Sequence, residues 1–236
     1  MKDRHTAAVS AQAMNRFGLP VSVAIATAVT MAGAVLVIFW LLLNFEPPGF
    51  LEALPIYLAI PAGLPLILGP LLVAGAMWGA LIAHLFGRPL VPAARTGALS
   101  VTGMIALLEL PVHLSQALAP PGWLPRPLGI HFFFTLIFMF EVALVSGVSA
   151  ARLCARLGVD GGPRIGTRAG IAGALGFALG SVVAAAMGFV VGEPPGTNMV
   201  WALHVGNVFA GLSAGWQFGR QLDAARSAVP PVGVRA

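Results

Sequence analysis

Long apolar segments alternate with short polar ones along almost the whole chain. The apolar segments lie at about 19–44, 62–87, 96–118, 129–151, 169–192 and 198–219. A helix that spans a membrane needs about 20 largely apolar residues, and each of these segments is long enough. The pattern predicts an all-α, polytopic membrane protein with six transmembrane helices.

The composition supports this prediction and limits what else the chain can contain. Of its 236 residues, 58% are hydrophobic and only 9% are charged, which is more apolar surface than a soluble domain of this size can bury. We therefore expect residues 16–220 to form one transmembrane domain, with cytoplasmic tails at 1–15 and 221–236. The single cysteine, Cys154, excludes a disulfide within the chain.

The basic residues fall almost entirely on one side of the predicted helices. That side holds Lys2, Arg4, Arg16, Arg88, Arg95, Arg152, Arg156, Arg164, Arg168, Arg220, Arg226 and Arg235. Only Arg126 falls on the other side. Because Lys and Arg in short loops stay in the cytoplasm, both termini are predicted to be inside, in the cell's inner (plasma) membrane. The positive charge thus indicates topology and a lipid bilayer as partner, with no nucleic acid.

Short motifs recur at similar spacing. Pro-Pro-Gly stands at 47–49, 120–122 and 194–196, in the three predicted outer loops. Arg-x-Gly opens each odd-numbered helix, at 16–18, 95–97 and 168–170. These motifs predict three tandem helical hairpins that pair helices 1 with 2, 3 with 4 and 5 with 6. The alternative is that any up-and-down bundle produces such a match without duplication.

Small residues at every fourth position indicate where helices approach one another closely in lipid. The fifth and sixth predicted helices carry Gly176, Gly180, Ala184, Gly188, Gly211 and Gly215. We expect these two helices to cross tightly. The same stripe could equally hold a second copy of the chain, as a homo-oligomer, or another membrane subunit.

Polar side chains at membrane depth are the most informative about function, because each is costly unless it is paired or wetted. In order of depth they are His131, His113, His204, Glu109, Asn207 and Glu141. With about 1.5 Å of rise per residue they lie roughly 6 to 21 Å from the outer loops. The inner half holds few such groups, so the pattern predicts a polar cavity that faces outward.

Three functions fit this set of residues. In the first, a small transporter or channel moves or binds a cation, proton or polar solute along Glu109, His113, Glu141, His204 and Asn207. In the second, His113, His131, His204 and Glu109 bind a metal ion, or two of the histidines bind haem, in a subunit of a membrane complex. In the third, the protein is a structural or assembly subunit and these residues only join helices.

The sequence gives no positive sign of an enzyme. Gly211-Leu212-Ser213-Ala214-Gly215 matches the nucleophile-elbow pattern, but that chemistry needs a turn between a strand and a helix. The segment lies within an apolar helix, so we interpret it as part of the small-residue stripe. No phosphate loop, dinucleotide motif or zinc-protease helix is present in the sequence.

Overall fold

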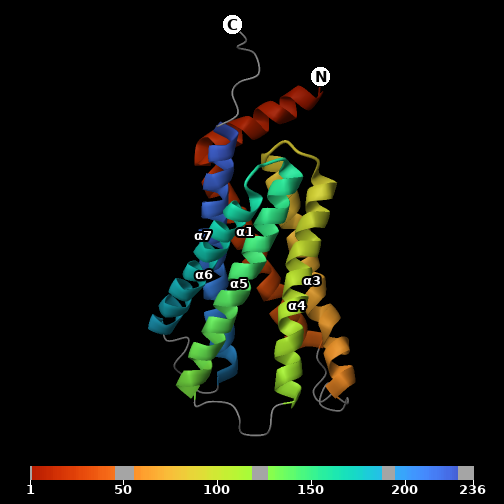
Figure 1. The fold of residues 1–236 in the computed structure, drawn as a ribbon, viewed down its shortest axis with the longest axis vertical. Coiled ribbons are helices and arrows are strands. Elements are labelled where there is room, and N and C mark those ends of the chain that lie inside the picture. The colour runs from red at the N-terminus through yellow and green to blue at the C-terminus, as the bar shows by residue number, and fades with distance from the viewer. Residues whose placement is uncertain (1, 46–55, 119–126, 188–194, 228–236) are drawn as a thin grey trace.

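The computed structural model describes residues 2–45, 56–118, 127–187 and 195–227, and the secondary structure in these residues is helical (Figure 1). The helices are α1 (Lys2–Phe45), α3 (Ile56–Leu85), α4 (Leu90–Leu118), α5 (Pro127–Leu157), α6 (Gly162–Ala186) and α7 (Pro195–Ser227). The predicted all-α fold is confirmed. The predicted end of the fifth helix, at 192, lies outside the described residues.

Five segments of the described chain are long and apolar enough to cross a membrane. They are Gly18–Ile38, Leu68–Leu85, Leu90–Leu107, Thr135–Leu157 and Gly162–Ala186. The protein is therefore a multi-pass membrane protein. The described part of α7 is not among the five, because residues such as Asn207, Ser213 and Gln217 make it more polar than the other helices.

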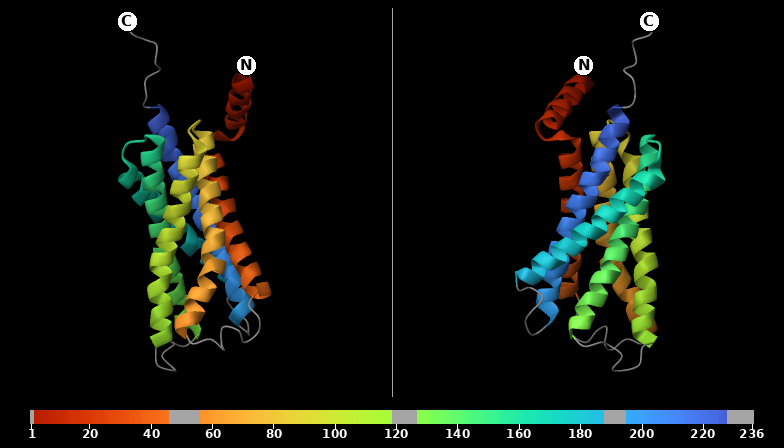
Figure 2. Two further views of the ribbon diagram at one scale, coloured as in Figure 1. Left: turned by 90° about the vertical axis from the view of Figure 1, so that its right-hand side faces the viewer. Right: turned by 60° about the vertical axis from the view of Figure 1, so that its left-hand side comes forward.

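α1 consists of two helical parts joined at a kink. Residues 2–17 are helical and turn away from the rest of α1, although residues 1–15 were predicted only as a cytoplasmic tail (Figures 1 and 2). The kink is at Gly18, whose φ of 69° and ψ of 151° lie in a region that is nearly exclusive to glycine. Pro20, two residues later, has no N–H to give the helical ladder, so the spanning part of α1 starts afresh there.

The helices form a closed ring in chain order. Each helix contacts the next, from α1 to α3, α4, α5, α6 and α7, and α7 packs back against α1. The short connections at 86–89 and 158–161 lie at the same end of the bundle as the start of α1 and the end of α7 (Figure 1). We call this the connection end.

Each of these connections contains a glycine within two residues of the end of the preceding helix. Gly87 and Gly158 have positive φ angles of 61° and 70°, as in a Schellman C-cap. The 6→1 hydrogen bonds of that motif are present, from Arg88 N to Ala83 O and from Val159 N to Cys154 O, both 2.9 Å long. The caps turn the chain sharply, so that α4 runs back along α3 and α6 along α5.

Glycines bring four of the six neighbouring pairs into close backbone contact. A Cβ on Gly75 of α3 would lie 2.7 Å from the carbonyl oxygen of Gly97 in α4. The same holds between α5 and α6, where a Cβ on Gly162 would lie 2.9 Å from the oxygen of Ala151. Between α6 and α7, a Cβ on Gly180 would come within 2.8 Å of the Gly206 Cα atom. None of these positions has room for a side chain.

The fourth close pair is α7 with α1, and it closes the ring. Cβ atoms on Gly211, Gly215 and Gly219 would lie 2.6, 2.7 and 2.6 Å from the Cα atoms of Ala28, Ala24 and Pro20. The remaining pairs, α1/α3 and α4/α5, have no described glycine at their contact and pack less extensively. We call these two the open seams.

Only one of the three predicted hairpins is a closely packed pair in the structure. Two of the predicted pairings, helices 1 with 2 and 3 with 4, correspond to the open seams α1/α3 and α4/α5. The expected close contact of the fifth and sixth helices is present as α6/α7, with Gly176 and Gly180 facing α7. Gly211 and Gly215 face α1 instead, and Gly188 lies outside the described residues.

Apolar side chains from all six helices fill the interior near the connection end. This end core comprises Leu19, Val23, Trp78, Ile82, Ala83, Ala93, Ala150, Leu153, Cys154, Leu157, Ile165, Ala169, Phe218 and Leu222. Cys154 is fully buried within it. Four of its residues, Trp78, Ala150, Ala169 and Phe218, also line the cavity described next, so the end core forms the floor of that cavity.

Candidate binding cavity

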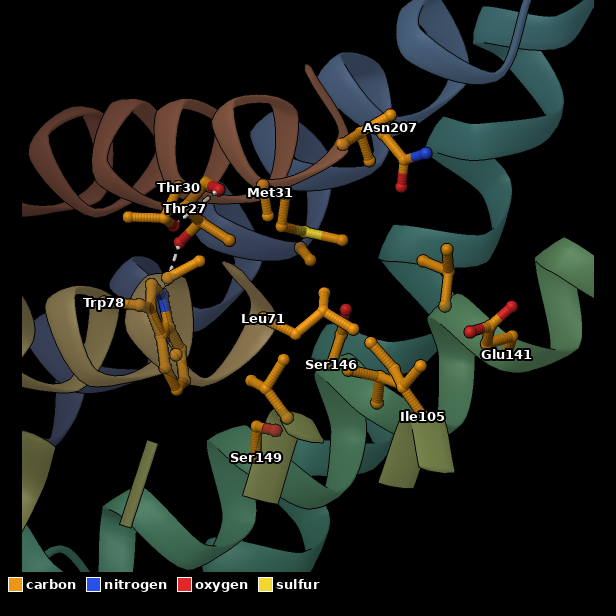
Figure 3. Close-up of a pocket in the computed structure, with 18 of the residues that line it drawn as sticks. Thr27, Thr30, Met31, Leu71, Trp78, Ile105, Glu141, Ser146, Ser149 and Asn207 are labelled. Atoms are coloured by element: carbon orange, nitrogen blue, oxygen red, sulfur yellow. Dashed lines mark hydrogen bonds between the residues drawn. The ribbon is translucent and has the colours of Figure 1, made fainter. Parts of the chain in front are cut away.

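A cavity of about 360 Å³ lies at the centre of the ring, and residues from all six helices line it (Figure 3). Its lining on α5 extends from Ala150, at the end core, to Phe138, which corresponds to about 18 Å along the helix axis. The volume is at the small end of the range for ligand pockets, which is about 300 to 1,000 Å³. The cavity is thus large enough for a small ligand.

The floor of the cavity is held in place by a ring contact and a hydrogen bond. Trp78 and Phe218, from α3 and α7, have ring centroids 6.0 Å apart and planes inclined by 34°. The Trp78 indole N–H donates to Thr27 Oγ1 at 3.0 Å, across the open seam between α1 and α3. Thr27 in turn donates to the Val23 carbonyl at 2.7 Å. The floor is therefore fixed to three helices.

Most of the cavity wall is apolar. Met31, Leu71, Ile105, Val142 and Val145 make up much of its middle part. The polar side chains are few and come from three helices. They are Thr27 and Thr30 of α1, Glu141, Ser146 and Ser149 of α5, and Asn207 of α7. Figure 3 shows Thr27, Thr30 and Trp78 toward one side and Glu141 and Asn207 toward the other.

Most polar hydrogens in this wall are already donated to the protein itself. Thr30 donates to the carbonyls of Ala26 and Thr27, at 2.8 and 3.1 Å. The Asn207 side-chain amide donates to the Leu203 carbonyl at 2.9 Å. Such bonds use the hydroxyl hydrogen of Thr30 and one of the two amide hydrogens of Asn207, and they leave the side-chain oxygen of each residue as an acceptor. The wall therefore offers acceptors at both residues, together with the second amide hydrogen of Asn207.

Ser149 lies in the same wall without such a bond. Its side chain is only 3% exposed, and its hydroxyl makes no hydrogen bond to any described residue. A buried hydroxyl without a partner costs about 1 to 3 kcal/mol, so such groups usually meet water or a ligand. Because Ser149 lines the cavity, that partner would lie inside it.

The structure brings together two of the residues that the sequence nominated. Glu141 and Asn207 line the same cavity from α5 and α7. His204, one turn before Asn207, is partly buried in α7 but is not part of the wall. The side chains of Glu109 and His113 in α4, and of His131 in α5, lie outside the described residues. Their proposed roles remain predictions.

Sequence analysis did not nominate Thr27, Thr30, Trp78, Ser146 or Ser149. A signal for α5 was available, because Glu141, Val145 and Ser149 follow one another at intervals of four and so share one helix face. No comparable signal identified Thr27 or Trp78, since their shared hydrogen bond depends on how α1 and α3 are rotated.

A metal site receives no support from the side chains that the structure describes. Among them, no three His, Cys, Asp or Glu residues come together. The metal or haem alternative depends on His113, His131 and Glu109, whose side chains lie outside that set, and it stays a prediction.

Comparison with known protein families, with curated proteins and with solved structures finds no significant match for this chain. The cavity is therefore the feature from which a function can be inferred.

Proposed function

We propose that this protein is a small transporter that binds a solute inside the membrane, in the cavity at the centre of its helix ring. In this proposal all six helices cross the bilayer and both termini are cytoplasmic. The observation that carries the proposal is a cavity lined by every helix, with a carboxyl group and an amide in a mostly apolar wall. A purely structural bundle gains nothing from such a space, because lost packing contacts destabilise it.

The position of the end core supports entry from the outer half of the membrane. It fills the interior next to the connection end, where Arg88, Arg156 and Arg220 are exposed. Basic residues at helix ends mark the cytoplasmic side. The cavity then opens toward the opposite, outer side, and transport requires the end core to loosen in a second conformation.

A structural subunit would be favoured if the small-residue stripe of the fifth helix faced another chain and Glu109 were satisfied within this one. The side chain of Glu109 lies outside the described residues. Gly176 and Gly180 instead face α7 of the same chain, and Ala184 is fully buried. The stripe is thereby explained by packing within the bundle.

Thiol labelling tests the proposal. We would replace Cys154 by Ala and introduce Ser146→Cys, which places a thiol in the cavity wall. A membrane-impermeant maleimide added to oriented vesicles is expected to label Cys at 146 from the outer side, and more slowly from the cytoplasmic side. The control is the wild-type protein, whose only thiol, Cys154, is fully buried in the end core and should not react.

The outcomes separate binding from transport. Labelling from the outer side alone would show that the protein binds a solute without transporting it. If a folded Ser146→Cys protein reacts from neither side, the cavity is not accessible and the proposed function is wrong.

A further inference from the structure

We infer that a groove on the outer surface of the helix ring binds one anionic phospholipid, at a site separate from the central cavity. The surface groove lies between α1 and α6, and α7 forms its base. α1 and α6 each pack extensively against α7 but not against each other, and α6 crosses α7 obliquely (Figure 2). The hollow left between them has a volume of about 620 Å³.

Most of the surface groove is apolar and open to the surroundings. Its lining includes five large apolar side chains that are 40% to 63% exposed, namely Ile25, Leu175, Leu179, Leu212 and Trp216. In a multi-pass membrane protein, such a surface meets the hydrocarbon chains of lipids. The lining on α6 covers about 10 Å of the helix axis. The surface groove therefore accommodates part of one acyl chain.

Two exposed arginines lie where the surface groove approaches the connection end. Arg220 follows Trp216 by four residues on α7, and Arg168 precedes Ala172 by four residues on α6. Residues four apart share a helix face, so both arginines belong to the faces that line the groove. Arg168 Nη1 donates to Gln221 Oε1 at 3.3 Å, which directs this guanidinium toward α7. The two cations therefore converge on one end of the groove.

The side chains along the surface groove follow the order of the parts of a phospholipid. From the connection end inward, α7 presents a charged group, an amide and an apolar group, at Arg220, Gln217 and Leu212. A glycerophospholipid has an anionic phosphate, then ester groups, then acyl chains. Guanidinium groups bind phosphate oxygens, and an amide N–H can donate to an ester carbonyl. The apolar part of the groove then receives the chain.

The charge of the two arginines favours an anionic lipid over a second copy of the chain. Among the described residues, neither Arg168 nor Arg220 is paired with a carboxylate. In a dimer with its two-fold axis perpendicular to the membrane, the same face of each copy meets the other. The arginines of the two copies would then lie at one level and repel each other. A zwitterionic lipid carries its own cation beside the phosphate, whereas an anionic lipid leaves the phosphate to the arginines.

Quenching of Trp216 fluorescence tests the inference, because this side chain lines the surface groove. The protein would be reconstituted in mixed vesicles of phosphatidylglycerol and phosphatidylcholine, with bromine on the acyl chains of one lipid or the other. Trp216→Phe in the same vesicles supplies the signal of the other tryptophans. Each basic residue near a membrane surface changes the affinity for anionic lipid about fivefold. Phosphatidylglycerol should therefore bind beside Trp216 roughly 5- to 25-fold more strongly than phosphatidylcholine at low ionic strength.

Single substitutions assign this preference to the two arginines. Arg168→Gln and Arg220→Gln should each lower the preference for phosphatidylglycerol about fivefold. The matched control is Arg156→Gln, which removes an exposed arginine at the same end of the bundle, on α5 and outside the surface groove. It should leave the preference unchanged. Inorganic phosphate added at constant ionic strength should not reduce the quenching by brominated phosphatidylglycerol, because free phosphate has no chain to place in the groove.

Three results would overturn the inference. Equal binding of the two lipids, or an equal loss of preference in Arg156→Gln, would show that the groove selects no lipid. Displacement by inorganic phosphate would show that the arginines bind a phosphate group without a lipid. If neither lipid quenches Trp216, and Leu175→Cys in the Cys154→Ala background forms a disulfide between two copies, the groove is a dimer interface. If an arginine variant does not fold, the comparison of the two lipids on the wild-type protein still decides.

Discussion

The hydrogen bond from Trp78 to Thr27 crosses one of the two open seams and fixes the floor of the cavity. In Thr27→Val the buried indole N–H loses its acceptor. Bonds between membrane helices are worth about 0.6 kcal/mol on average and up to about 1.7 kcal/mol, so we expect a destabilisation of about 1 kcal/mol. Unfolding of the purified protein by SDS in mixed micelles measures it.

The control is Thr30→Val, one turn further along α1, because the Thr30 hydroxyl bonds only to carbonyls of its own helix. Its effect should be clearly smaller. Combining Thr27→Val with Trp78→Phe gives a double-mutant cycle. Additive effects in that cycle would show that the bond between Trp78 and Thr27 does not contribute to the free energy of unfolding.

At the scale of single residues, the sequence predicted part of the site. Glu141 and Asn207 were found because a charged or amide group stands out in an apolar helix. His204 was expected on the same pathway, but it is offset from Asn207 by about 60° around α7, and only Asn207 lines the cavity. Ser149 was missed because a serine in a transmembrane helix usually bonds its own backbone, and only the structure shows that this one does not.

At the scale of helices, the close pairs depend on glycines at their crossing points. In Gly97→Ala the added methyl group would meet the backbone of Gly75 and Gly79, which cannot move aside as a flexible side chain can. Overpacking of this kind typically costs about 1 to 3 kcal/mol. We therefore expect a lower midpoint of SDS unfolding in Gly97→Ala and a looser contact between α3 and α4.

Gly103→Ala is the matched control, on the same helix and with the same change. A Cβ on Gly103 meets nothing within 4 Å. Because alanine is a better helix former by about 1 kcal/mol in water, this variant should be neutral or slightly more stable. Equal destabilisation in both variants would show that backbone freedom, and not the crossing with α3, makes Gly97 necessary.

The sequence predicted that helices exist and which faces carry small residues, but not every partner. Runs of apolar residues are sufficient to predict that helices exist, because a helix makes all of its backbone hydrogen bonds internally in lipid. A glycine stripe shows only that something approaches closely. Gly211 and Gly215 therefore suggested a contact with the fifth helix, while in the structure they meet α1. The rotation of all six helices together decides such pairings.

At the scale of the whole molecule, the two open seams divide the ring into two units. One unit is α3 with α4, and the other is α5, α6, α7 and α1, each joined internally by glycine contacts. The cavity lies between them and is lined by both. Packed glycine contacts resist change more than seams without them, so we expect the two units to move as bodies when the cavity opens.

Spin-label distances test this division. In the Cys154→Ala background, labels at Leu99 in α4 and Leu175 in α6, both exposed, report on the distance between the units. Labels at Ile25 in α1 and Leu175 report within the larger unit. We expect the first distance distribution to be broader than the second, because only the first is measured across the open seams. Equally narrow distributions would show that the two units do not move relative to each other.

The contact between α1 and α7 has a consequence for how the protein is made. The ribosome completes α1 before any other helix and α7 after all the others, yet Pro20, Ala24 and Ala28 receive their glycine partners only from α7. A half-synthesised chain consequently exposes one face of its oldest helix to lipid throughout translation. The ring closes only when α7 packs against α1, so the binding cavity is complete only after α7 has been made.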